Sequence, residues 1–298
     1  MASKKCISEL KDSNGDIKRT TNDITEVATK FYTDLFNTKS TDNRATEKLL
    51  RNIKNTISLT QRDFLDRPII LEDLEKATKK LQKGKSPGPD GIPAEFYQYF
   101  WENIKHLYID YITAVKSSCF PKSKNTSITT LIYKERGETY LLANYRPISL
   151  MNVDIKILTK MLSMRLLVVL PSIIHETQTA VYGRRIDNNV NLVRDLIDLA
   201  NKDDEEAALL FLDQEKAFDR VNHKVLFKTM ERFGIGVNFI SWIKTIYSNA
   251  STCIDINGYL TKNISINSGV RQGCPLSPYL FIILSPALFH DIHSVHPD

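Results

Sequence analysis

The 298-residue chain has few cysteines and no long apolar run, and each absence excludes a class of protein. Its four cysteines form no CxxC pair and have no histidine beside them at ligand spacing, which indicates a reduced, intracellular protein without structural zinc. The uninterrupted apolar runs are short, and runs such as Leu166–Leu170 and Leu280–Leu284 fall far short of the roughly 20 residues of a membrane-spanning helix. We therefore expect no membrane partner.

The charge balance is mildly basic. Lys and Arg number 40 and Asp and Glu 35, which gives a net charge of +5. With 42% hydrophobic and 25% charged residues, the composition is that of an ordinary globular protein and excludes a mostly disordered chain. A net charge of this size permits a nucleic-acid partner but does not specify one.

The apolar periodicity mixes helices with antiparallel hairpins, which predicts the α+β class. Helices are expected at about 24–36, 71–83, 93–115, 155–169, 187–201, 222–233, 237–249 and from 277 onward. Strands are expected within 7–17, 128–134, 143–150, 207–213 and 252–266. Asp23 is the expected cap of the first helix, and the polar stretch 37–46 is expected to be a surface loop.

The apolar segment Ala207–Asp213 ends in a carboxylate. A strand with this pattern projects its final side chain from a sheet edge, and hard cations such as Mg²⁺ prefer oxygen ligands held on a rigid element. Asp213 is therefore a candidate metal ligand, with the backbone carbonyl of Gln214 as a second. The alternative is a strand followed by a helix-capping aspartate.

The string Asp213-Gln-Glu-Lys-Ala-Phe-Asp-Arg-Val-Asn-His223 resembles motif A of reverse transcriptases from non-LTR retrotransposons, which are the long interspersed element type. Three other segments resemble motifs of the same family, in the family's order along the chain: motif zero at 85–91, motif 2 at 144–150 and motif B at 268–278. Residues 178–184 resemble a further family segment less closely. The resemblance covers about 7–285, and it favours this group over the related group II intron maturases.

The resemblance implies a right-hand polymerase fold with fingers and a partial palm, the thumb being absent. It divides the chain into an N-terminal extension at 1–60 (the linker from a missing endonuclease domain), fingers with the first palm elements at 61–206, and a partial palm with motifs A and B at 207–298. The family activity is RNA-templated DNA synthesis by two-metal nucleotidyl transfer with Mg²⁺ or Mn²⁺. The implied partners are an RNA template, a DNA primer and a deoxynucleoside triphosphate (dNTP), in a nuclear or cytoplasmic ribonucleoprotein.

The resemblance also implies roles for single residues around the nucleotide. Asp213 matches the carboxylate that bridges both ions, and Phe218 matches the bulky residue beneath the incoming sugar. Arg146 and Lys134 match basic residues that reach the triphosphate, and Gln272 matches a nucleotide contact in motif B. Without the motifs, Phe218 is an ordinary core aromatic, and a lone Arg or Lys on a hairpin is a solvated surface charge.

Template contacts are implied at the two glycine-containing loops. Gly273 of motif B lets a template approach closely, although the same glycine suits a tight turn. In the motif zero loop the implied template residues are Lys85, Asp90 and Gly91. Lys85 ends a run of five lysines that starts at Lys76 and contains no acid, which fits either a phosphate backbone or a solvated helix face.

Motif C, a second source of carboxylates, is missing. The sequence has no Asp-Asp pair after residue 213, and its single pair, Asp203-Asp204, precedes motif A. We therefore expect this chain to be catalytically inactive, as a fragment of a longer retrotransposon protein whose endonuclease, motif C and thumb are missing. The alternatives are a non-catalytic RNA- or DNA-binding remnant and a vestigial interaction module.

Overall fold

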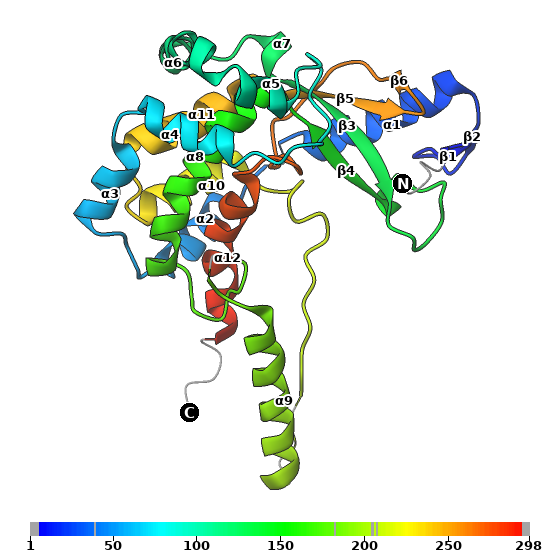
Figure 1. The fold of residues 1–298 in the computed structure, drawn as a ribbon. Coiled ribbons are helices and arrows are strands. Elements are labelled where there is room, and N and C mark those ends of the chain that lie inside the picture. The colour runs from blue at the N-terminus through cyan, green and yellow to red at the C-terminus, as the bar shows by residue number, and fades with distance from the viewer. Residues whose placement is uncertain (1–5, 39, 182, 204–205, 207, 294–298) are drawn as a thin grey trace.

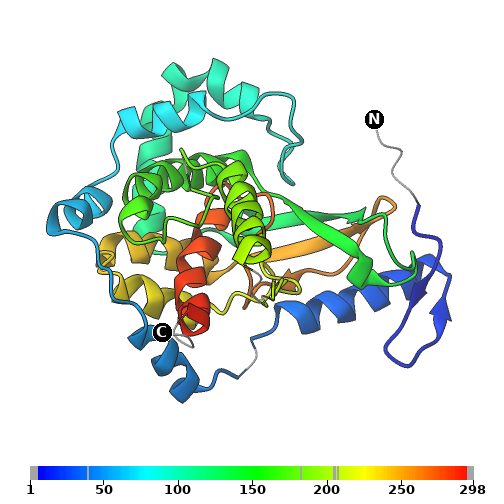
Figure 2. The same cartoon turned by 90° about the horizontal axis from the view of Figure 1, so that it is seen from below.

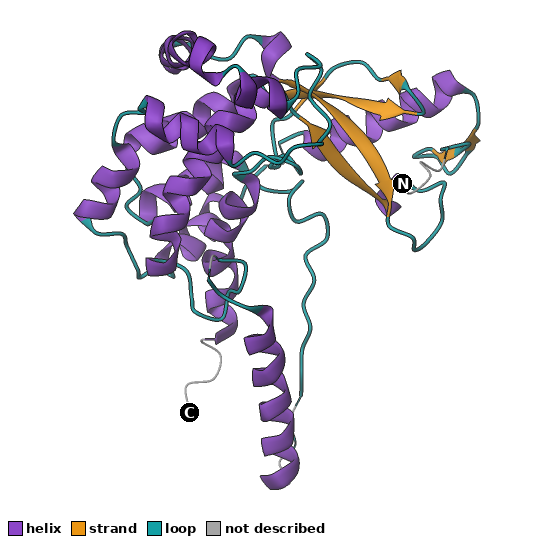
Figure 3. Cartoon of the chain, viewed as in Figure 1, coloured by secondary structure: helices purple, strands orange, loops and turns teal. Residues whose placement is uncertain are grey.

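The computed structural model of the chain describes residues 6–38, 40–181, 183–203, 206 and 208–293. Figure 1 shows a helical body at one end of the molecule, a sheet at the other, and one helix that stands away from both. Figure 3 shows that helices predominate over strands. This mixture confirms the predicted α+β class.

The main sheet joins strands that are far apart in the sequence. Its strands are β3 (Thr126–Tyr133), β4 (Tyr145–Leu150), β5 (Ser251–Ile256), β6 (Tyr259–Leu260) and β7 (Ile264–Ser265). Their order is β4-β3-β5-β6, and β7 also pairs with β5. The β3–β4 pair is the predicted antiparallel hairpin, whereas β3 and β5 are parallel, a pairing that the sequence pattern does not indicate.

A long helix covers this sheet, and an N-terminal hairpin packs against that helix. The hairpin consists of β1 (Leu10–Lys11) and β2 (Ile17–Lys18), within and just beyond the range expected for strands, and Asn14 and Gly15 lie in the turn between them. Helix α1 (Thr21–Phe36) packs against β5, β6 and β7 and lies along the sheet (Figure 2). The predicted cap at Asp23 is wrong: the Thr20 hydroxyl oxygen accepts the Asp23 backbone N–H at 3.2 Å, so the helix begins three residues earlier.

The helical body is built around α8 (Val153–Val169), which packs against α3, α4 and α12. The other helices of this body are α2 (Asn43–Arg51), α3 (Leu59–Asp66), α4 (Leu71–Lys79), α5 (Ala94–Tyr99), α6 (Trp101–Ser117), α7 (Lys122–Asn125), α10 (His223–Arg232), α11 (Val237–Ser248) and α12 (Ser277–His293). Short 3₁₀ turns occupy Leu142–Asn144 and Leu170–Ser172. The expected loop at 37–46 is wrong in its last part, because Asp42 caps α2 there.

Helix α9 (Ile186–Asp203) and residues 208–214 form an arm that leaves the body (Figure 1). None of the described side chains of α9 is buried. The strand predicted at 207–213 is wrong for residues 208–213, which have no regular structure, and Ala207 lies outside the described residues. Leu210 is 78% exposed and Phe211 82%. Nowhere in the described ranges is a helix both long and apolar enough to cross a membrane.

Candidate functional site

The β3–β4 hairpin presents two of the predicted basic residues. Arg146 pairs with Ile132 across the hairpin and its side chain is exposed. Lys134 follows β3, and its ammonium donates to the carbonyl of Ala143 at 2.8 Å. This bond holds the Lys134 side chain against the 3₁₀ turn that precedes β4 and Arg146, so both cations lie on one end of the hairpin.

The motif A segment separates into an exposed part and a buried part. Asp213 and Gln214 are exposed, with no hydrogen bond or ion pair to any residue that the structure describes. The chain then turns at 215–220, where the Lys216 carbonyl accepts the backbone N–H of Asp219 at 2.9 Å. The Asp219 side chain is buried, whereas Lys216 is half-buried.

The motif B loop is tied to motif A and to β4. The Val270 N–H donates to the Phe218 carbonyl at 2.8 Å, and the Ser149 N–H donates to the Gln272 carbonyl at 2.7 Å. The Gln272 side-chain amide lies 3.4 Å from the Asp219 carboxylate. Gly273 has φ +111°, and a Cβ there would lie 2.7 Å from the Ser149 carbonyl oxygen. The backbone of β4, within the protein itself, therefore already requires a glycine at 273.

These three segments meet around one cavity of about 60 Å³. Lys134 and Arg146 come from the hairpin, Lys216 and Asp219 from motif A, and Gln272 from motif B. Helix α1 completes the wall with three side chains, Phe31, Tyr32 and Leu35. The cavity thus brings together three cations, one carboxylate and one amide from segments up to about 140 residues apart in the sequence.

Burial shifts the pKa values of three titratable side chains that line this cavity. Desolvation raises the pKa of the Asp219 carboxyl to about 6, although the Gln272 amide and the nearby Lys216 and Lys134 act in the opposite direction. Desolvation also lowers the pKa of the Lys216 ammonium. Burial first, and then the charge of Asp219, raises the pKa of the Tyr32 phenol. Excess positive charge around an apolar wall suits an anionic ligand.

Phe218 does not line this cavity. Its ring stacks on Phe281 of α12, with ring centroids 5.3 Å apart and an angle of 18° between the planes. This contact agrees with the interpretation of Phe218 as an ordinary core aromatic. The role of Phe218 beneath the sugar of an incoming nucleotide stays a prediction.

The motif zero loop lies against the N-terminus of α8. The Asp90 carboxylate pairs with Lys124 at 3.2 Å, and its backbone N–H donates to the Asn152 side chain at 3.2 Å. A Cβ on Gly88 would lie 2.3 Å from the Asn152 nitrogen, so the loop contacts α8 closely. Lys85 and Gly91 are exposed. Asp90 is therefore engaged in an internal contact, while Lys85 and Gly91 face outward.

The described donor set does not form a divalent-cation site by itself. Mg²⁺ takes six oxygen ligands in an octahedron. The segment offers the Asp213 carboxylate and the Gln214 carbonyl, and no group of three or more His, Cys, Asp or Glu side chains close enough for a metal occurs within the described part of the chain. Asp213 can supply one ligand to a metal, but not a complete shell.

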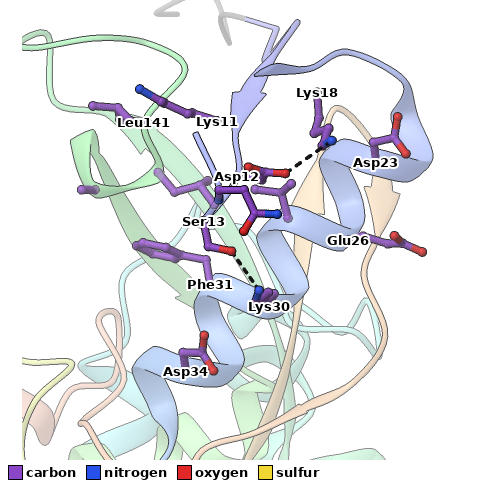
Figure 4. Close-up of a pocket in the computed structure, with 14 residues that line it drawn as sticks. Lys11, Asp12, Ser13, Lys18, Asp23, Glu26, Lys30, Phe31, Asp34 and Leu141 are labelled. Carbon is purple, nitrogen blue, oxygen red and sulfur yellow. Dashed lines mark hydrogen bonds and ion pairs between the residues drawn. The ribbon is translucent and has the colours of Figure 1, made fainter. Parts of the chain in front are cut away.

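A larger pocket, of about 450 Å³, lies between the N-terminal hairpin and α1 (Figure 4). Two of the three lysines in its lining are engaged within its own wall: Lys18 pairs with Asp12 at 3.4 Å, and Lys30 donates to Ser13 at 2.9 Å. Four carboxylates line this pocket against three lysines, so its charge suits an anion less than that of the smaller cavity. We therefore take the smaller cavity as the candidate site.

Comparison with known proteins identifies the family. Residues 132–296 match the family described as reverse transcriptase (RNA-dependent DNA polymerase). The chain belongs to the reverse transcriptase family. Together with the relatives below, this match confirms the prediction of a reverse transcriptase domain of the non-LTR retrotransposon type.

The curated relatives come from transposable elements. The chain is 38% identical over 260 residues to the transposon TX1 uncharacterized 149 kDa protein of Xenopus laevis, covering 87% of this chain and 20% of that protein. It is 30% identical to the retrovirus-related Pol polyprotein from type-1 retrotransposable element R2 of Popillia japonica, over 72% of this chain and 29% of the relative. It is 25% identical to the RNA-directed DNA polymerase from mobile element jockey of Drosophila melanogaster, over 93% of this chain and 30% of that protein. The chain thus spans less than a third of each relative.

Sequence reasoning missed several residues at the candidate site. Phe31 and Tyr32 looked like the apolar face of a helix, because nothing in the sequence shows that α1 packs beside motifs A and B. Arg271 was passed over, yet its buried guanidinium donates to the Asn125 carbonyl and side-chain oxygens at 2.8 and 2.9 Å. This pair fixes the residue before Gln272 to the end of α7, directly before β3. The available signal was that Arg271 is the single charged residue of motif B at 268–278.

Proposed function

We propose that residues 1–298 form the nucleotide- and template-binding part of a right-hand polymerase. The β3–β4 hairpin belongs to its fingers (61–206), residues 207–298 to a partial palm, and residues 1–60 to an N-terminal extension. The ligands are a dNTP and an RNA template paired with a DNA primer. One observation carries this proposal: Lys134, Arg146 and Gln272, all implied nucleotide contacts, come from distant segments and line the same cavity with motif A.

The chemistry of each group supports a triphosphate ligand. Arg146 offers a planar fork of donors for phosphate oxygens, and its exposure leaves those donors available. Lys134 supplies a point charge beside it. The Gln272 amide is oriented by Asp219 and can donate to, or accept from, the remainder of the nucleotide. At about 60 Å³ the hollow is smaller than a usual ligand pocket of 300–1,000 Å³, so a nucleotide would extend beyond it.

In this proposal residues 1–298 bind but do not polymerise. Two-metal transfer needs several carboxylates around the ions, and motif A contributes Asp213 alone. Lys85 and Gly91, which face outward on the motif zero loop, remain the proposed template contacts, and Asp213 remains the proposed metal ligand when Mg²⁺ or Mn²⁺ is bound.

Nucleotide binding is the direct test. We expect titration calorimetry to show that dTTP binds the chain and that Arg146→Ala weakens the affinity at least tenfold. Lys228→Ala, which removes an exposed lysine on α10, should leave it unchanged. Equal affinity in Arg146→Ala and the wild type would contradict the proposal.

Primer extension tests the absence of polymerisation. With poly(rA)/oligo(dT), dTTP and Mg²⁺, we expect no incorporation by residues 1–298. Robust incorporation that Asp213→Ala abolishes would overturn the inactivity and leave the nucleotide site standing.

A further inference from the structure

Lys216 adopts a backbone conformation that lysine rarely adopts. Its φ is +52°, in the left-handed region, where glycine and asparagine are the residues that fit with little strain. Of the non-glycine residues that the structure describes, two others share this region, Glu135 and Asn257, and both lie in hairpin turns. Strained backbone of this kind gathers at functional sites, where the surrounding structure maintains it.

The Lys216 side chain is held by a ring and not by an acid. Its ammonium lies 4.5 Å from the centroid of the Phe31 ring on α1. It forms no ion pair within 4 Å with any residue in the described part of the chain, although Asp219 is among the charges near it. A cation held over a ring keeps its donors available to an incoming anion.

Lys216 also lies in the wall between two hollows. One is the cavity of about 60 Å³ that contains Lys134, Arg146, Asp219 and Gln272. The other, of about 430 Å³, is lined by Arg220 and Asp34 on the far side of Lys216. Phe31 and Leu35 of α1 line both hollows. Together the two hollows have four cations against two carboxylates, and their combined volume falls in the range of nucleotide-sized pockets.

We propose that the Lys216 ammonium binds a phosphate group of the nucleotide triphosphate, which extends from the small cavity past Phe31 into the larger hollow. This inference rests on the proposed nucleotide site and adds a binding residue from motif A to the two on the hairpin. It explains why a lysine occupies a position where glycine would be less strained: the side chain is retained for the ligand.

The test separates folding from binding, with inorganic tripolyphosphate as the probe. In Lys216→Gly we expect the melting temperature to stay the same or rise, and the calorimetric affinity for tripolyphosphate to fall at least tenfold. Lys216→Asn, which also tolerates this conformation, is the second variant should the glycine variant fail to fold. Lys216→Arg should retain most of the affinity, and Lys228→Ala all of it.

The results that would contradict the role of Lys216 differ from those that would contradict the proposed nucleotide site. Unchanged affinity in Lys216→Gly and Lys216→Asn, with a tenfold loss in Arg146→Ala, would overturn the role of Lys216 and leave the proposed function intact. No loss in any of these variants, or no tripolyphosphate binding by the wild type, would overturn both. A fall in melting temperature with unchanged affinity would show that Lys216 is structural.

Discussion

Helix α8 and the arm (α9 with residues 208–214) are both rich in apolar residues, yet their burial is opposite. In α8, twelve of seventeen residues are buried, among them eight of its eleven apolar side chains. In the arm, Leu209 through Leu212 are each more than half exposed. Helix α8 has α3, α4 and α12 packed on its sides, whereas the apolar stretch of the arm lies away from the body (Figure 3).

The comparison shows what each kind of element requires. A helix satisfies its backbone hydrogen bonds within its own segment, so α9 remains helical without being buried. A strand needs a neighbouring strand for every such bond. Residues 208–213 have the composition of a strand, but no described segment pairs with them, so that composition alone does not produce one.

The largest expected effect is the difference between two leucines, one in each region. Leu162 in α8 is fully buried, and Leu162→Ala should lower the free energy of unfolding by about 3 kcal/mol, since it removes buried methyl groups and leaves a cavity. Leu210→Ala in the arm should change it by less than about 0.5 kcal/mol, because that side chain is already in solvent. Urea denaturation of both variants measures the difference. Equal losses would show that the arm packs against the body in solution.

The sequence predicted α8, α10 and α11 of the body and α9 of the arm, whereas it missed α2, α3 and α7 of the body and the irregular backbone of residues 208–213 in the arm. The periodicity of α8, α10 and α11 and the turn residues of the hairpins are local signals, and the structure confirms these elements. The parallel pairing of β3 with β5 and the placement of α1 beside motif A depend on contacts between distant segments, which composition does not encode. At the site, the motifs predicted Lys134, Arg146 and Gln272, which the structure brings together. The place of Tyr32 and Lys216 in the wall of this cavity could be recognised only from their neighbours in the structure.

Asp219, where the arm joins the body, should give an intermediate, pH-dependent effect. Burial raises its pKa from 3.8 to about 6, so the folded state holds a proton more tightly than the unfolded state. The stability from this group is complete below pH 4 and is lost as the pH rises through 6. Asp219→Asn should therefore match the wild type near pH 4 and exceed its free energy of unfolding by about 2 kcal/mol at pH 7.

Chemical denaturation of both proteins at pH 4, 5, 6 and 7 measures this difference. The gap should open between pH 4 and 6 and stay constant above that. A variant that is less stable than the wild type at pH 7 would show that Lys216 and Lys134 outweigh burial, and that the junction is held by ionic attraction.

The smallest expected effect lies in the turn that leads out of the arm, where Glu215 pairs with Arg220 at 2.8 Å. The side chains are 67% and 47% exposed, so water and salt screen the attraction, and side-chain entropy offsets most of the remainder. Glu215→Ala should lower the free energy of unfolding by less than about 0.5 kcal/mol. Differential scanning calorimetry should show a shift of under about 1 °C, vanishing in 1 M NaCl. A larger shift that persists in salt would mean that this ion pair fixes the turn and orients Lys216, and the arm would then be more firmly joined to the body than its exposure indicates.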